Sequence, residues 1–327
     1  MIAVTWVGGL VRRRPVEFAA AVLAIALSIG FLAALGTFVS VDRAHLTTRA
    51  AASVVVDWQV QSTAAADVSQ VSAAARRIAH ERAAVAVDLA AVRSLSATSA
   101  SATRTTGRAW VVGLPASYPS AFPAQMQALV GDLNGAVLLQ QTASNLAVAP
   151  GSTVAVQPPS GPVRHVRITG VATMPQEDSF FQTVGAPAGA GPSAPPDNVL
   201  VVPSGQFSAV TSGATVIHQV HVGFDHTWLP ADPARAAAVD AQARNHFEGT
   251  LAGAGLVGDN LGAALSAARE DALYGELLFL LLGLPAFVVA LAVTALVVGV
   301  RGERRVRELA LLRVRGARTR ELAAVAG

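Results

Sequence analysis

Two long apolar stretches dominate the hydrophobic pattern of this chain. Residues 18–41 and residues 277–300 each run for 24 residues without a charged side chain. A helix needs about 20 apolar residues to cross a bilayer, and it satisfies its own backbone hydrogen bonds there. The alternative, a buried core helix, rarely contains so long a charge-free run. The first stretch also exceeds the roughly 7 to 15 apolar residues of a signal peptide. The pattern therefore predicts two transmembrane helices, the first an uncleaved anchor.

Between these stretches, residues 42–276 show the shorter periodicities of an α+β domain. Residues 54–60 predict a strand, apolar positions at helical spacing predict a helix over residues 68–78, and alternation resumes over residues 84–95. A segment rich in Pro, Gly, Ala and Ser, residues 173–197, predicts a long surface loop. The remaining predicted strands are 109–114, 136–139, 153–157, 163–171, 199–202 and 216–224, and the remaining helices are 232–246 and 260–274.

Arginines flank both apolar stretches on the side away from this domain. Three arginines, residues 12–14, precede the first stretch, and eight follow the second between residues 301 and 320. Because cytoplasmic flanks collect basic residues, both termini are predicted to be cytoplasmic in a multi-pass protein of the cytoplasmic membrane. The expected parts are a cytoplasmic N-terminus (1–17), a first span (18–41), an extracytoplasmic α+β domain (42–276), a second span (277–300) and a cytoplasmic segment (301–327).

Composition excludes several chemistries. Only 14% of the 327 residues are charged, and the mean hydropathy is +0.48, whereas roughly a quarter of the residues of an ordinary soluble domain are charged. All 24 basic residues are arginine, and the sequence contains no cysteine. The chain therefore lacks the lysine of a P-loop ATPase, and disulfides and thiol nucleophiles are excluded. The high pI of about 10.4 reflects the two arginine-rich flanks and does not indicate a nucleic acid. The sequence also indicates no cofactor.

The histidines form the densest group of candidate metal or catalytic residues. His218, His221 and His226 lie close together with Asp225. Their spacing along a strand predicts that His218 and His226 share one face while His221 points to the other, so a single strand supplies at most two ligands. We interpret the three as solvated strand histidines and Asp57 as a surface or turn residue. No catalytic or metal-binding residue is assigned.

Small residues recur every fourth position within the first apolar stretch. Ala26, Gly30 and Ala34 lie on one side of a helix, where a second helix can approach closely. They are the predicted helix-packing residues. Neither apolar stretch contains His, Asp, Glu or Arg, so no ion site or proton relay within the membrane is expected.

The segment after the second apolar stretch carries a motif. Residues 308–313 read Glu-Leu-Ala-Leu-Leu-Arg, and Gly-Ala-Arg follows at residues 316–318. In this position the motif resembles the segment that follows the second membrane helix in FtsX/MacB-type ABC transporter permeases. The order of arginine cluster, span, large outer domain, span and motif resembles that family over the whole chain. Residues 135–139 and 150–154 are similar to a further stretch of the family, with Ser152 in place of the usual Asp.

The resemblance implies an outer domain of the MacB-like periplasmic core type and a permease subunit of an ABC transporter. In such permeases the short helix after the second span docks against the ATPase, whose closure moves the spans and the outer domain. We therefore expect coupling of ATP hydrolysis on a separate chain to transport or mechanotransmission, and no enzymatic activity of this chain. The implied partners are the ATPase subunit, a second permease copy or half, membrane lipid and, as an option, a periplasmic or cell-wall partner. Carried over residue by residue, the implied ATPase-coupling residues are Glu308, Leu309, Leu312, Arg313, Gly316 and Arg318.

Since the family has four or ten spans, the chain is expected to be the N-terminal part or a truncated form of a permease.

Two other functions are compatible with the same pattern. A membrane-tethered hydrolase would use the outer domain, with His218, His221 and Asp225 as its candidate residues. A two-span sensor or binding module would use the basic tail only as a flank on anionic headgroups.

Overall fold

The computed structural model describes residues 15–63, 66–99, 102–182, 184–185 and 195–281, with a few isolated positions up to residue 292. The chain divides into two units, which are described separately. Met1–Arg43 and Glu270–Gly327 form the helical unit, and Ala44–Arg269 forms the outer unit.

Two helices account for the described residues of the helical unit. One is the first part of α2 (Pro15–Ser53), and the other is the continuation of a helix that occupies residues 260–281. Among the residues that the structure describes, no helix combines the length and the hydropathy that crossing a bilayer requires. The two transmembrane helices therefore stay predictions.

Side chains near the outer-unit end of these helices hold them together. The rings of Phe38 and Phe279 lie 5.0 Å apart between their centroids. Arg43 forms an ion pair with Glu276. The two helices of this unit thus contact each other through one aromatic pair and one charged pair.

Twelve strands of the described residues form one sheet in the outer unit, in the order β12-β1-β11-β2-β5-β10-β7-β9-β8-β3-β4, with β6 paired to β9. The strands are β1 (Trp58–Ser62), β2 (Glu81–Val92), β3 (Ser94–Thr98), β4 (Thr103–Thr105), β5 (Ala109–Leu114), β6 (Gln127–Gly131), β7 (Ala136–Leu139), β8 (Thr153–Gln157), β9 (Arg164–Thr173), β10 (Val199–Pro203), β11 (Val216–Phe224) and β12 (Gly255–Asp259). The shorter helices are α3 (Val68–Ala75), α4 (Tyr118–Ala121), α5 (Gln140–Leu146), α6 (Glu177–Phe180), α7 (Ser204–Val210), the 3₁₀ helix η1 (His226–Trp228) and α8 (Pro233–Leu251).

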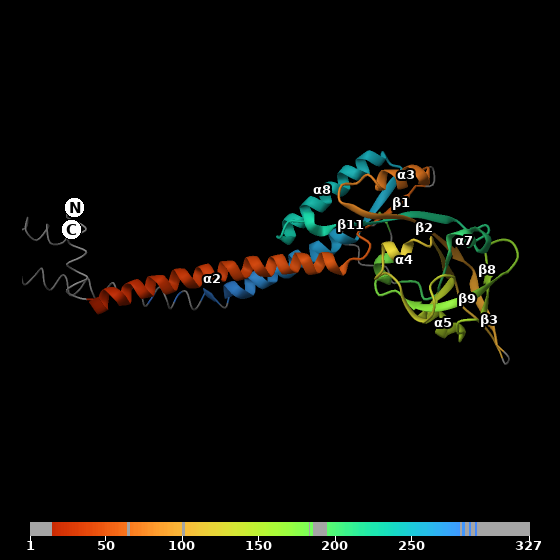
Figure 1. Ribbon diagram of the computed structural model, residues 1–327, viewed down its shortest axis with the longest axis horizontal. Helices are drawn as coiled ribbons and strands as arrows, with labels where there is room; N and C mark the ends of the chain where they lie inside the picture. The colour runs from red at the N-terminus through yellow and green to blue at the C-terminus, as the bar shows by residue number, and fades with distance from the viewer. Residues whose placement is uncertain are drawn as a thin grey trace, which may run out of the picture. The chain divides into compact units, whose positions relative to one another are not determined.

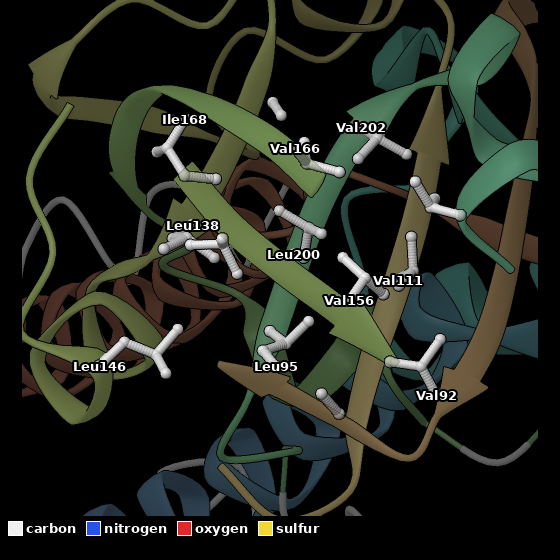
Figure 2. Packing of buried hydrophobic residues seen from close by; sticks show 14 of the residues in the cluster. Val92, Leu95, Val111, Leu138, Leu146, Val156, Val166, Ile168, Leu200 and Val202 are labelled. Carbon is white, nitrogen blue, oxygen red and sulfur yellow. The ribbon is translucent and has the colours of Figure 1, made fainter. Parts of the chain in front are cut away.

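Part of this sheet closes on itself. Only Arg93 separates β2 from β3, yet the two strands stand far apart in the strand order. The path β2-β5-β10-β7-β9-β8-β3 therefore forms a ring, because its last strand continues its first. Alternate side chains of these strands point inward and make a buried cluster, closed by α5 and α7. Figure 2 shows Leu95, Leu138, Val156 and Leu200 converging within it.

The other faces of the sheet are covered by helices. The opposite side chains of β2, β5, β7 and β10 pack against α4 and α6 around Tyr118, Phe122 and Phe180. The strands β1, β11 and β12 pack their apolar side chains, with Trp58 at the centre, against α3 and α8. Figure 1 shows α3 and α8 beside β1 and β11. Burial on both faces stabilises the domain at about 25 cal/mol for each Å² of apolar surface.

Most predicted elements are confirmed. Strands β5, β7, β8 and β11 have the predicted bounds, and β9, β10 and α8 differ by a few residues. The predicted strand over residues 54–60 begins only at Trp58, because α2 continues to Ser53 through a run of residues that favours helix. The strand predicted over residues 84–95 is divided at Arg93 into β2 and β3. The predicted loop after residue 173 contains the short helix α6.

Candidate functional site

Two helices, α2 and the helix that starts at residue 260, connect to the sheet at the same end of one strand pair. Strand β1 follows α2 after a four-residue link, and β12 leads directly into the helix that starts at residue 260. The two strands are antiparallel neighbours, and the first residue of β1, Trp58, pairs with the last residue of β12, Asp259. Antiparallel pairing places the start of one strand beside the end of the other. We call this region the junction. It comprises the Trp58–Asp259 end of the strand pair and the side chains of Asp57, Asp240 and Asn260 beside it.

Asp57 is the central polar group of the junction. Its side chain is 1% exposed. One carboxylate oxygen accepts a hydrogen bond of 2.6 Å from the backbone N–H of Phe224, and the other lies 2.8 Å from His226 Nε2. Its backbone carbonyl accepts from the N–H groups of Asn260 and Leu261 at 3.0 and 3.1 Å. Asp57 therefore fixes the end of β11, η1 and the start of the second helix, and its interpretation as a surface residue was wrong.

Three amide side chains connect the same region to α2 and to the segment around α6. Asn260 Nδ2 donates to the carbonyl of Val56 at 2.8 Å, and Asn260 Oδ1 accepts from Gln182. Gln176 donates to the carbonyl of Ser53, the last residue of α2. Buried backbone carbonyls need such partners, because an unpaired one costs about 1–3 kcal/mol. Asn260 thus satisfies the buried Val56 carbonyl, and Gln176 attaches the exposed end of α2 to the start of α6.

Asp240 and Asp259 place two carboxyl groups against each other beside this turn. Trp58 Nε1 donates to Asp240 Oδ1 at 3.2 Å, and Asp259 Oδ1 accepts from the N–H of Gly262 at 2.6 Å, which caps the helix. A Cβ on Gly262 would lie 2.3 Å from Asp259 Oδ2 and 2.8 Å from Asp240 Oδ2, so both oxygens border one small space. Arg244 Nη1 is 3.5 Å from Asp259.

This pair holds a proton at neutral pH. Burial first, and then the charge of Asp259, raise the pKa of Asp240 to about 9. Burial also raises the pKa of Asp259. Two buried carboxylates that lie side by side repel each other when both are ionised, so Asp240 keeps its proton at neutral pH.

The last turns of α2 belong to the outer unit and are attached to it. Thr47 is buried, and its hydroxyl donates to the carbonyl of Ala231 at 2.8 Å, in the turn before α8. Ala51 packs into the cluster around Trp58. Consequently the C-terminal end of α2 is held by the domain core as well as by the chain connection.

The predicted histidine cluster does not form one site. His218 Nδ1 lies 2.7 Å from Asp88 Oδ1, whereas His226 is paired with Asp57. Strand β11 ends at Phe224, so His226 lies in η1 and does not share a strand face with His218 as predicted. Within the described ranges, no group of three or more His, Cys, Asp or Glu side chains could hold a metal ion.

His221 is fully buried, whereas we expected it to be solvated. Its Nε2–H donates to Gln219 Oε1 at 3.2 Å, and its Nδ1 accepts from the Tyr118 hydroxyl at 2.9 Å. Gln219 in turn donates to Gln61 Oε1 at 3.4 Å, and the Phe180 ring packs at 4.9 Å from the imidazole. Burial lowers the pKa of His221 to about 3, so it stays neutral. These hydrogen bonds form a polar network in the core. Its members lie in segments far apart in the sequence, so a local sequence pattern could not predict their contacts.

The remaining predicted site residues are not tested here. The coupling residues Glu308, Leu309, Leu312, Arg313, Gly316 and Arg318 lie outside the described residues. Ala26, Gly30 and Ala34 are exposed on α2, and a Cβ on Gly30 would meet no atom of the described residues within 4 Å. Packing of a further helix on this stripe stays a prediction.

The fold and the junction define a class of protein: an α+β domain inserted between two helices that meet it at one strand pair. The family described as MacB-like periplasmic core domain matches residues 18–246. The chain belongs to this family, and its outer unit is the extracytoplasmic domain of a MacB/FtsX-type ABC transporter permease.

The chain is similar to solved structures, among them two domains of transporters. The periplasmic region of MacB from Actinobacillus actinomycetemcomitans aligns with 9% identity and a TM-score of 0.41, covering 63% of this chain and 91% of that one. The extracellular domain of the noncanonic ABC-type transporter YknZ from Gram-positive bacteria aligns with 13% identity and a TM-score of 0.35, covering 62% and 98%. No curated protein matches the chain.

Proposed function

We propose that the chain is a permease subunit that couples ATP hydrolysis on a separate ATPase chain to movement of its outer domain. The observation that carries this proposal is the junction. Both helical connections enter the domain at the pair Trp58 and Asp259, and the buried Asp57 and Asn260 bind the two connections to each other. A displacement of either helix is therefore passed directly into the sheet.

The proposed coupling to the ATPase rests on the sequence after residue 300. An apolar stripe with arginines beside it, including Leu309, Leu312 and Arg313, suits a groove on a soluble partner. Gly316 would allow the chain to change direction after the predicted helix. The chain performs no chemistry in this proposal, and the energy comes from the partner.

Membrane placement is part of the same proposal. Residues 18–41 and 277–300 would cross the cytoplasmic membrane, with both arginine-rich flanks on the cytoplasmic side. A second permease copy or half would complete the transporter, and the stripe Ala26, Gly30 and Ala34 would pack against a neighbouring helix. The large outer domain would deliver the movement to cargo or to an envelope partner.

Copurification tests the ATPase contact. The full chain in detergent is incubated with the cognate ATPase, and the variants Leu309→Asp and Leu312→Asp are compared with Leu311→Asp, which falls on another side of the predicted helix. The first two should retain less than about a tenth of the bound ATPase, because a buried carboxylate opposes docking. Undiminished binding by both would contradict the docking role.

Engineered disulfides test the mechanical part, since the chain has no cysteine of its own. Phe38→Cys with Phe279→Cys, joined through a short bifunctional methanethiosulfonate, would lock the two helices together, whereas a direct disulfide between Gln61→Cys and Leu256→Cys would join two strand positions that are already paired. We expect the crosslink between the helices to suppress ATP hydrolysis by the reconstituted complex, with recovery on reduction. The strand pair should leave hydrolysis unchanged. Hydrolysis that is insensitive to the helix lock would refute mechanical coupling.

A further inference from the structure

A pocket of about 290 Å³ lies over the sheet beside α6. Its floor comes from four adjacent strands, because paired and alternate residues of neighbouring strands share one face. The floor residues are Gln61 on β1, Gln219 and Ile217 on β11, Leu89 on β2 and Trp110 on β5. Phe180 at the end of α6 and Gln182 after it also line the space. We call it the amide pocket after its three glutamines, Gln61, Gln182 and Gln219. Its volume is close to the lower end of the roughly 300–1,000 Å³ of small-molecule sites, so it suits a small group.

The lining of the amide pocket is neutral and largely apolar. None of the described residues that line it is charged. Leu89 and Phe180 are buried beneath the space, and Ile217 and Trp110 are half-buried. An ion that entered would lose its hydration without gaining a counter-charge, which is costly. The lining therefore selects an uncharged occupant with an apolar part.

Three polar groups of this lining are free to bind an occupant. Gln61 Oε1 accepts from Gln219, and Gln182 Nε2 donates to Asn260, so each of these two amides has one end engaged. The Gln61 Nε2 group, the Gln182 Oε1 atom and the Trp110 indole N–H have no hydrogen-bond partner among the described residues, and none of the three is buried. Together they offer two donor groups and one acceptor.

A chain of hydrogen bonds from the core fixes the orientation of the Gln61 amide. Gln219 is 4% exposed; its amide accepts from His221 Nε2–H at 3.2 Å and donates to Gln61 Oε1 at 3.4 Å. His221 in turn accepts from the buried Tyr118 hydroxyl at 2.9 Å. Because these bonds engage the oxygen of Gln61, its Nε2 group is left for an occupant before any occupant arrives. Such preorganisation reduces the entropy that binding costs.

We propose that the amide pocket binds one uncharged, apolar residue of a partner polypeptide. The side chain of that residue contacts the aliphatic floor at Leu89 and Ile217. Its backbone carries one N–H donor and one carbonyl oxygen with two lone pairs. The N–H donates to Gln182 Oε1, and the carbonyl oxygen accepts from Gln61 Nε2 and the Trp110 indole. The free groups of the pocket thus match the backbone of one residue in number and in kind.

Two other occupants fit the amide pocket less well. A sugar ring carries hydroxyls on most of its carbons, which exceeds the three free groups, and hydroxyls buried without partners oppose binding. A lipid chain would cover the apolar floor but would leave the free groups of Gln61, Gln182 and Trp110 desolvated and unpaired. The proposal does not depend on ATPase coupling, so either one can fail alone.

Fluorine NMR of the full chain in lipid nanodiscs tests the proposal. The chain contains four tryptophans, so labelling with 5-fluorotryptophan gives one signal for each, and Trp110→Phe identifies the signal from the pocket. The probe is the uncharged peptide acetyl-Ala-Leu-Ala-amide. We expect it to shift the Trp110 signal saturably and to leave the signal of Trp58, which lies in another cluster, unchanged. Gln61→Met removes the free donor at similar size and should raise the dissociation constant by about three- to tenfold.

Gln242→Met supplies the matched control, because Gln242 is exposed on α8 outside the pocket. It should keep the dissociation constant within about twofold of the unaltered chain, since distant sites act independently. An unshifted Trp110 signal, or equal affinity of the two methionine variants, would overturn the proposal. Tighter binding of N,N′-diacetylchitobiose than of the peptide would also overturn it, by assigning the pocket to a carbohydrate.

Discussion

At the scale of single residues, the junction depends on one proton. Asp240 and Asp259 come from α8 and β12, and their carboxyl groups border the space next to Gly262. Neutral Asp240 accepts from Trp58 and can donate to Asp259, so the pair is compatible with burial. The proton therefore acts as a structural component at the position where the second helix begins.

The pH dependence of unfolding should reveal this proton. The pKa of Asp240 is about 9 in the folded chain against 3.8 ordinarily. Between these values the folded state holds a proton that the unfolded state has released, so the free energy of unfolding falls as the pH rises. This contribution is complete below pH 3.8 and is lost by about pH 9.

Asp240→Asn tests that dependence. Asparagine keeps the acceptor for Trp58 and a donor for Asp259, but it cannot ionise. Tm of the full chain in detergent, measured from neutral to alkaline pH, should fall less for this variant than for the unaltered chain. Asp271→Asn, at an exposed position, is the control and should keep the original slope. Parallel slopes for Asp240→Asn and the unaltered chain would show that Asp240 is already ionised.

The Tyr118–His221 bond offers a second residue-scale prediction. Tyr118→Phe leaves a fully buried imidazole nitrogen without its donor, so we expect a loss of about 1–3 kcal/mol in the free energy of unfolding. Tyr274→Phe is a natural control, because the only other tyrosine of the chain is 68% exposed. Denaturant unfolding of the two variants gives the comparison. Equal stability would mean that the bond contributes nothing net.

Sequence could not predict these polar networks, for reasons that Asp57 makes clear. An aspartate is usually exposed, and nothing next to it in sequence identifies its partners. Those partners, Phe224, His226 and Asn260, follow more than 160 residues later. The one local signal was its position between three valines and a tryptophan, which indicates a buried environment. The long-range pairing of β1 with β11 and β12 supplies the rest.

At the scale of elements, prediction succeeded where one face of a strand is apolar. Strands β5, β7, β8 and β11 contain β-branched runs and were found with their bounds. Strands β4 and β6 were missed because every residue in them is exposed, so they carry no alternation. Strand β12 was missed because its five residues include two glycines, which are depleted in strands.

Asn260 permits a prediction about the element that follows β12. Asn260→Ala removes the donor to the buried Val56 carbonyl and the acceptor for Gln182, so the outer unit should lose about 1–3 kcal/mol of unfolding free energy. Asn245→Ala, on the exposed side of α8, should change it by less than about 0.5 kcal/mol. Thermal and denaturant unfolding of the full chain measure both. A stable Asn260→Ala variant would argue against the junction as a rigid connection.

At the scale of the whole molecule, the family assignment agrees with the order of parts in the sequence. The sequence alone predicts both the outer α+β domain and the MacB/FtsX-type family, the first from periodicity and the second from the resemblance of residues 308–318. The sequence could not predict the strand order. Strands β2 and β3 are two parts of one strand that bends at Arg93, and each part pairs with different neighbours. Local patterns contain no information on those pairings.

Orientation in the membrane is the corresponding whole-molecule prediction. A reporter that is active only in the cytoplasm, fused after Gly327, should be active, whereas a reporter inserted at Gly161 in the exposed loop between β8 and β9 should be inactive. The reason is the arginine excess on both flanks. A reporter that requires an extracytoplasmic position supplies the inverse control. Activity of the Gly161 insertion in the cytoplasmic assay would reverse the predicted topology.

The five register pairs between β1 and β12 have a mechanical consequence. Both helices attach at the Trp58–Asp259 end, so opposed forces directed along the two strands load all five pairs together, in shear. Opposed forces directed across the strands load only the first pair, and the strands then peel apart one pair at a time. The attachment of the outer unit therefore resists forces along the strands more strongly than forces that pull the two strands apart.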